Sequence, residues 1–195
     1  MNSAALAYWT RHYRIRRAAR AITAGGVVAY PTEAVWGLGC DPFDEVAVAQ
    51  ILELKGRKVT KGVILVAAGL DQLVPFIGAL DAAGQQRLAA VGDRAVTWVV
   101  PASAVAPQWL TGGRDTIAVR IIGHPVAAAL CRVAGTALVS TSANPQGRLP
   151  ARSAMKVHQY FHGLLADITP GAVGRATKPS EIRDIRSGQI LRSGG

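Results

Sequence analysis

Apolar residues occur along the chain in short runs that alternate between helical spacing and the continuous pattern of buried strands. Broad apolar sides at helical spacing predict helices at Tyr13 to Thr23, Asp44 to Lys55, Leu70 to Gly78, Asp81 to Ala90, Pro125 to Ala134 and Ser153 to His162. Short apolar runs bounded by Gly, Pro or polar residues predict strands at Val27 to Tyr30, Val63 to Ala68, Ala95 to Val100, Thr116 to Ile122 and Ala137 to Ser140. Their interleaving indicates an α/β or mixed α+β domain, with helices packed on a sheet.

Residues with strong backbone preferences mark the ends of several predicted elements. A Gly-Gly pair ends the first helix, and Asp44 is the expected N-cap of the second. Pro125 suits the first turn of a helix, and a hairpin is predicted for Glu181 to Ile185 with Gln189 to Arg192. No repeat, low-complexity tract or linker divides the chain, so we expect one domain.

Composition also favours a folded domain, because half of the 195 residues are apolar and 17% are charged. At about 100–200 residues per domain, this chain has enough material for one buried core, and disorder is excluded. The apolar runs are shorter than the roughly 18 residues of a membrane span, and we find no secretory leader. We therefore expect a cytoplasmic protein without membrane contact. Cys40 and Cys131 lie far apart, so buried thiols are expected and a disulfide framework or zinc site is not.

Charge gives the first indication of a partner. The chain has 22 Lys and Arg against 12 Asp and Glu, a formal charge of +10, so we expect it to attract a nucleotide, RNA or an acidic substrate. Residues 1–20 form a basic segment that leads into a domain over residues 21–195. Five arginines of this segment precede the first acid, Glu33: Arg11, Arg14, Arg16, Arg17 and Arg20. They suggest a polyanion, although an exposed helix face is the commoner explanation of such a run.

Four cations are concentrated in residues 55–62 (KGRKVTKG), between a predicted helix and a predicted strand. They are Lys55, Arg57, Lys58 and Lys61. The dipole of a helix attracts cations to its C-terminus, which accounts for one or two of the four. Phosphate is the natural ligand of the remaining charge in a loop flanked by glycines.

Polar side chains also stand at or near the ends of predicted strands. Ser140, Ser142 and Asn144 follow an apolar strand, where open α/β sheets bind ligands, although a simple polar turn would use the same residues. Thr32 follows the first strand. Arg120 lies where the strand pattern predicts burial, so it requires an anion: a protein carboxylate such as Glu33, or the carboxylate of a substrate.

Several common catalytic motifs are absent. The sequence contains no P-loop, no Rossmann glycine motif after a strand and no G-x-S-x-G elbow, which disfavours an ordinary kinase, dehydrogenase or α/β-hydrolase. His158 and His162 are four residues apart on a predicted helix and could share a metal ion. No third ligand is nearby, so an exposed helix face is the better interpretation and no metal site is expected.

Several short segments resemble, in order, the motifs of the YrdC/Sua5 family. Residues 30–41 (YPTEAVWGLGCD) look like its opening motif, and residues 54–62 (LKGRKVTKG) look like its Lys-x-Arg segment. Later matches are residues 118–120 with 124–125, 140–144, 179–184 and 190–192. The likeness covers about Ala21 to Gly195 and is to the short form of the family, without a C-terminal extension.

The resemblance implies a twisted mixed sheet around a large basic cleft that binds ATP, L-threonine and bicarbonate. The implied activity is that of a nucleotidyltransferase, which forms L-threonylcarbamoyladenylate and pyrophosphate. A separate transferase complex would use this product to make N6-threonylcarbamoyladenosine at position 37 of certain tRNAs. Mg²⁺ is expected to accompany the ATP.

The resemblance also assigns roles to individual residues, with Lys55 and Arg57 as the principal catalytic pair. The expected ATP-binding residues are Lys55, Arg57, Lys61, Thr116, Ser142, Asn144 and Arg192. The expected threonine-binding residues are Thr32, Arg120, Ser140 and Ser180, with Arg120 on the carboxylate. The chain departs from the common family pattern at Pro145, Gln146 and Pro150, and Lys58 replaces a common proline.

Two other functions remain open at this stage. One is an RNA-binding or ribosome-maturation module that uses the basic cleft as a groove. The chain shows no RNA-stacking aromatic motif, and only 6% of its residues are aromatic, so this ranks second. The other is a carbamoyl-transferring domain of the same fold, which normally belongs to a much longer chain.

Overall fold

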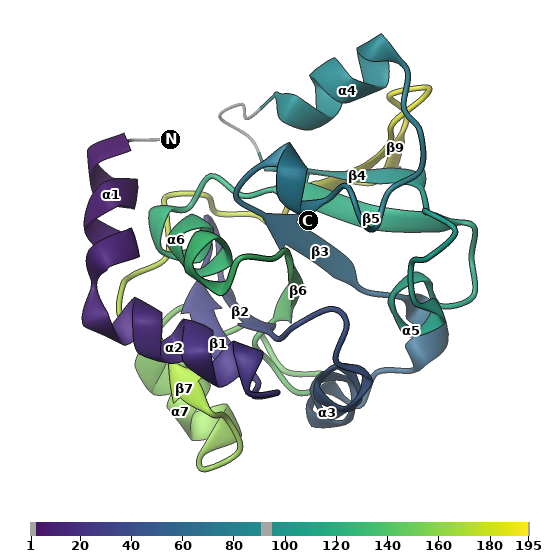
Figure 1. Ribbon diagram of the computed structural model, residues 1–195. Coiled ribbons are helices and arrows are strands. Elements are labelled where there is room, and N and C mark those ends of the chain that lie inside the picture. The colour runs from purple at the N-terminus through teal and green to yellow at the C-terminus, as the bar shows by residue number, and fades with distance from the viewer. Residues whose placement is uncertain (1–2, 91–94, 195) are drawn as a thin grey trace.

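The fold is built on a mixed sheet that brings together strands from both ends of the chain (Figure 1). The computed structural model describes residues 3–90 and 95–194. Within these residues, nine strands form the sheet in the order β7-β1-β2-β6-β3-β5-β4-β8-β9. They are β1 (Val28–Pro31), β2 (Trp36–Gly39), β3 (Ile64–Ala67), β4 (Val96–Pro101), β5 (Thr116–Ile121), β6 (Leu138–Ser142), β7 (Asp167–Ile168), β8 (Glu181–Asp184) and β9 (Ile190–Arg192). The mixed α/β prediction is confirmed.

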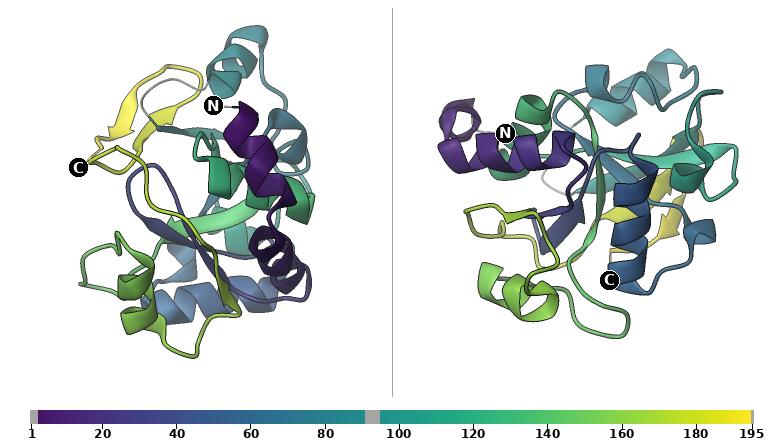
Figure 2. Two further views of the ribbon diagram at one scale, coloured as in Figure 1. Left: turned by 90° about the vertical axis from the view of Figure 1, so that its left-hand side faces the viewer. Right: turned by 60° about the horizontal axis from the view of Figure 1, so that its bottom comes forward.

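Helices cover both faces of this sheet. They are α1 (Ser3–Arg11), α2 (Tyr13–Thr23), α3 (Glu45–Lys55), α4 (Ala82–Ala89), α5 (Gln108–Thr111), α6 (Pro125–Ala134) and α7 (Ala154–Phe161), with 3-10 turns η1 (Val59–Lys61) and η2 (Leu70–Gln72). Both α1 and α2 pack on α6 at one side of the molecule (Figures 1 and 2). In contrast, α3 contributes its buried residues to the core on the opposite face.

The core consists of two apolar clusters, one on each face of the sheet. Successive residues of β3 divide between them, with Leu65 and Ala67 in the cluster beneath α3 and Val66 in the cluster beneath α6. This follows from the two-residue period of a strand. Because both faces are covered, the strands appear in the sequence as continuous apolar runs.

Strand β6 joins the two halves of the sheet. Its first part, Leu138 to Ser140, pairs with β3, while Thr141 and Ser142 pair with β2. The predicted strand ended at Ser140, but these later hydrogen bonds extend it through Ser142. The polar end of β6 therefore belongs to the sheet at the point where its two halves meet.

Most predicted helix ends are confirmed. Asp44 and Asp81 cap the N-termini of α3 and α4 through their carboxylates, and Pro125 begins α6. The predicted helix at Leu70 to Gly78 is wrong, because only η2 forms there. Pro75 cannot donate a helical hydrogen bond, and its ring clashes with the preceding turn. Sequence analysis also missed α1, β2, α5 and β7.

The arginine-rich helix packs into the fold instead of standing apart from it. Its residues Ile15, Ala18 and Ile22 are fully buried beneath α6, which leaves the arginines on the outer side. Arg17 donates two hydrogen bonds to Asp167 of β7, at 2.8 and 2.6 Å. The boundary at residue 20 remains a prediction.

Two simpler expectations can also be compared with the structure. Cys40 and Cys131 are free, buried thiols, as predicted. Among the helices of the described residues, none combines the length and apolar character of a membrane span.

Leu65→Ala tests the central place of β3. Leu65 is fully buried, so its truncation should lower the free energy of unfolding by about 2–5 kcal/mol, as cavity-forming substitutions do. Val46→Ala on α3 is the control, because Val46 is 79% exposed and should change stability by no more than about 0.5 kcal/mol. Urea denaturation measures both variants. Equal effects would contradict the packing described here.

Candidate active site

A large cavity, with a volume of about 900 Å³, lies over the sheet and is lined by residues from most of its strands. Side chains of residues paired across neighbouring strands lie on the same face of the sheet, so the strand register determines which residues line the cavity. Arg120 pairs with Val66, and Ile64 pairs with both Ala118 and Ser140. The cavity therefore lies on the same face of the sheet as α6, beside the part of that face that α6 covers.

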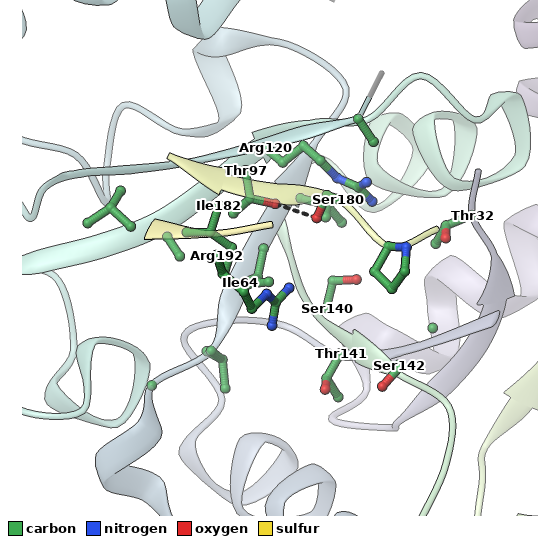
Figure 3. Close-up of a pocket in the computed structure, with 18 of the residues that line it drawn as sticks. Thr32, Ile64, Thr97, Arg120, Ser140, Thr141, Ser142, Ser180, Ile182 and Arg192 are labelled. Carbon is green, nitrogen blue, oxygen red and sulfur yellow. Dashed lines mark hydrogen bonds between the residues drawn. The ribbon is translucent and has the colours of Figure 1, made fainter. Parts of the chain in front are cut away.

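Nine of the eleven residues predicted for the site line this cavity: Thr32, Arg57, Lys61, Thr116, Arg120, Ser140, Ser142, Ser180 and Arg192. Figure 3 shows side chains of Arg120, Ser140, Ser180 and Arg192 turned toward a shared space. They come from four strands or their flanking loops. Residues from segments far apart in the sequence therefore meet in one cavity.

The cavity is strongly cationic. Six cations are among its described lining residues: Arg57, Lys61, Arg114, Arg120, Lys178 and Arg192. Glu33 is the sole carboxylate of the same lining. A hollow with five more positive than negative groups will concentrate anions from solution.

Lys55 and Asn144, the other two predicted residues, lie behind the wall. Lys55 is 8% exposed, and its Nζ donates to the backbone oxygens of Ser142 and Asn144, the latter at 2.9 Å. The Asn144 side-chain oxygen also accepts from Lys55 Nζ at 3.3 Å and from Ser142 Oγ at 2.6 Å. Lys55 therefore fixes the turn that presents Ser142 to the cavity.

Among the residues that the structure describes, no carboxylate forms an ion pair with the Lys55 ammonium, and this affects its titration. Burial lowers its pKa to about 8, with a further contribution from the nearby Arg57 guanidinium. The hydrogen-bond acceptors around it are the neutral oxygens of Ser142 and Asn144.

Arg57 lies on the cavity side of the same segment. Its Nη2 donates to the Gly62 carbonyl at 2.9 Å, while its buried Nε has no hydrogen-bond acceptor in the described part of the chain. Burial lowers the pKa of Arg57, and the guanidinium groups of Arg192 and Arg114 lower it further. Mutual repulsion of this kind is relieved by a bound anion.

The sequence suggested either a protein carboxylate or a substrate carboxylate as the anion for Arg120. In the structure, the carboxylate of Glu33 lies beside it. Arg120 Nη1 lies 3.3 Å from Glu33 Oε2. The other carboxylate oxygen, Glu33 Oε1, accepts a hydrogen bond from the Gly123 N–H at 2.8 Å. Neither Glu33 Oε2 nor Arg120 Nε, both buried, has a hydrogen-bond partner within residues 3–90 and 95–194.

Sequence reasoning missed several polar residues of the lining, among them Thr97, Arg114 and Lys178. Thr97 is fully buried and its hydroxyl lies 2.8 Å from that of Ser180, as the dashed line in Figure 3 shows. The sequence feature that could have identified Thr97 is a single hydroxyl residue within an otherwise apolar strand. Arg114 and Lys178 occur in polar loops, where a cation gives no signal of this kind.

The described residues do not fit a resident metal ion. No group of three or more His, Cys, Asp or Glu side chains in residues 3–90 and 95–194 could hold one. His158 and His162 approach each other, with ring nitrogens 2.9 Å apart, on the exposed surface of α7.

A family model described as "Telomere recombination" (Sua5, YciO and YrdC) matches residues 20–194. The chain belongs to this family. Threonylcarbamoyl-AMP synthases from Cellvibrio japonicus and Halorhodospira halophila are each 53% identical to it, over 94% of this chain and 97% and 96% of theirs. The fold of this family member is also similar to P. abyssi Sua5 complexed with L-threonine, with a TM-score of 0.87 and 34% identity. That alignment covers 94% of this chain and 54% of Sua5.

The depressed pKa of Lys55 predicts a pH dependence of stability. Between pH about 8 and 10.5 the unfolded chain keeps a proton that folded Lys55 has lost, so Lys55 adds a positive contribution to the slope of stability against pH in this window. The buried thiols of Cys40 and Cys131, whose pKa values burial raises, contribute with the opposite sign. Lys55→Met should therefore make the slope more negative than in the wild type. Lys58→Met is the control, because Lys58 is exposed and should leave the slope unchanged. Urea denaturation at several pH values would contradict the assignment if both variants retained the same slope.

Proposed function

We propose that this family member is a threonylcarbamoyl-AMP synthase, which forms L-threonylcarbamoyladenylate and pyrophosphate from ATP, L-threonine and bicarbonate. The observation that carries this proposal is the meeting, in one cationic cavity, of nine residues to which the family resemblance assigns a role in the site. The relatives of that name, aligned over nearly their whole length, support it. They favour an enzyme over the RNA-binding alternative.

The size and charge of the cavity suit this reaction. About 900 Å³ is near the upper end for small-molecule sites, which leaves room for an amino acid beside a nucleotide. The amine of threonine and bicarbonate form an N-carboxylate with loss of water. An oxygen of this N-carboxylate then attacks the α-phosphate of ATP, and pyrophosphate leaves. Every reacting group is an anion, so catalysis consists mainly of neutralising and aligning them. No nucleophilic side chain is needed.

The triphosphate is assigned to the cluster of Arg57, Arg114 and Arg192, together with Lys61. Burial and mutual repulsion disfavour the charge of Arg57, and phosphate oxygens would offset both effects. Ser142, held in place by Lys55 and Asn144, would donate to a phosphate or ribose oxygen. Lys55 thus acts as a positioning residue in this proposal, and Thr116 lies on the nucleotide side.

Threonine is assigned to the wall formed by Thr32, Arg120, Ser140 and Ser180. Each lines the cavity, and Arg120 is the buried cation suited to the α-carboxylate. Thr97 would hold the Ser180 hydroxyl in position through their 2.8 Å contact. P. abyssi Sua5, which is similar in structure, has been crystallised with L-threonine.

The proposed product also indicates its consumers and location. A carbamoyl group joined to AMP is an activated acyl donor, so a separate transferase complex would take it up for N6-threonylcarbamoyladenosine synthesis on tRNA. ATP and tRNA are both cytoplasmic, and we propose that location for the reaction. Mg²⁺ would enter with the triphosphate, whose charge it would help to neutralise.

Pyrophosphate release from ATP should require both L-threonine and bicarbonate, and Arg57→Ala should lower kcat/KM by about 10²–10³-fold. The melting temperature should change little, because Arg57 sits in a repulsive cluster. Lys58→Ala removes a neighbouring cation that is exposed and outside the cavity lining, so it should remain active. Coupled pyrophosphate detection and mass spectrometry of the adenylate provide the measurement. Equal release without threonine would refute the proposal.

A further inference from the structure

Glu33 is unusual in its setting, as the only carboxylate among the described residues that line a cavity with six cations. A lone anion there could merely neutralise Arg120. Neutralisation alone does not explain the presence of Glu33, because its carboxylate competes with anionic substrates for the buried Arg120 and so weakens their binding. The position of each carboxylate oxygen indicates a second role.

The two oxygens of Glu33 differ in their surroundings. Oε1 accepts a hydrogen bond from the Gly123 N–H at 2.8 Å, which fixes the carboxylate to the loop after β5. Oε2 is buried, lies 3.3 Å from Arg120 Nη1 and receives no hydrogen bond. Arg120 Nε is equally buried and has no acceptor. Unsatisfied buried groups are costly, and here one acceptor and one donor belong to two oppositely charged side chains that form an ion pair.

This pair matches the two charges of an amino acid. In a zwitterion the α-ammonium and α-carboxylate are attached to the same carbon, so partners for both must lie next to each other. If Arg120 binds the carboxylate, the remaining five cations of the cavity repel the ammonium. Glu33 is the only described lining residue whose charge attracts it.

We propose that Glu33 binds the α-ammonium of the amino acid through Oε2 and so selects free α-amino acids over other carboxylic acids. The inference deepens the proposed function and rests on it. An ammonium hydrogen-bonded to Oε2 satisfies the orphaned acceptor, while the carboxylate satisfies the orphaned donor on Arg120. Bound in this way, the nitrogen that must become carboxylated is held at a defined place beside the nucleotide.

A comparison of two ligands separates this role from simple support of Arg120. Isothermal titration would measure L-threonine and a 2,3-dihydroxybutanoate of matching configuration, in which a hydroxyl replaces the ammonium. Glu33→Gln keeps the shape of the side chain and can still accept from Gly123. We expect it to weaken threonine binding about 10- to 100-fold, the effect of losing a hydrogen bond to a charged group. Binding of the dihydroxy acid should stay the same or tighten.

Asp167→Asn is the matched control, since Asp167 also pairs with an arginine but lies outside the cavity lining. It should leave the affinity for threonine unchanged. The KM for threonine in pyrophosphate release gives a second readout, and an unchanged affinity for ATP shows that Glu33→Gln is folded.

Three results would overturn the inference. Equal weakening of both ligands in Glu33→Gln would show that Glu33 only positions Arg120, and an unchanged affinity for threonine would show that it does not contact the amino acid. In either case the synthase activity would stand. A wild-type protein that neither binds threonine nor releases pyrophosphate with it would instead remove the proposed function and the inference with it.

Discussion

The arrangement of the site depends on how the protein holds cations near one another without neutralising them. Arg57 and Arg114 donate to the carbonyls of Gly62 and Thr60, and Lys55 is surrounded by oxygens of Ser142 and Asn144. Neutral carbonyls satisfy hydrogen bonds but leave the net charge in place. The cavity therefore retains a positive field, which a carboxylate in each of these positions would have cancelled.

The sheet makes this arrangement possible by bringing the cationic segments to one face. Strand β6 joins the two halves of the sheet, so its polar end lies between the loop after β1 and the centre of β5. Across this junction, Glu33 approaches Arg120 and Lys55 reaches Ser142, each pair being 87 residues apart in the chain. The chemistry of the site is thus a consequence of strand order.

Much of the fold and of the candidate site could be predicted from the sequence, and the elements and contacts that were missed have physical explanations. Strands such as β3 and β5 were found because burial on both faces makes them continuously apolar. Strand β2 was missed because Gly37 and Gly39 lower its strand propensity, and at Gly39 the close approach of Val139 and Tyr30 leaves no room for a side chain. A Cβ at Gly39 would lie 2.6 Å from the Val139 carbonyl oxygen. The Glu33–Arg120 pair depends on contacts between distant segments, which no local pattern contains.

Lys55 and Arg57 show the limit of a motif as a guide to mechanism. They are two residues apart in one basic segment, yet they face different surroundings. Gly56, with a φ of +59°, ends α3 between them and reverses the chain. Lys55 consequently remains on the helix and points into the wall of β6, whereas Arg57 leaves the helix and joins the cavity lining. One glycine thus separates a cation that builds the site from a cation that is available to a ligand.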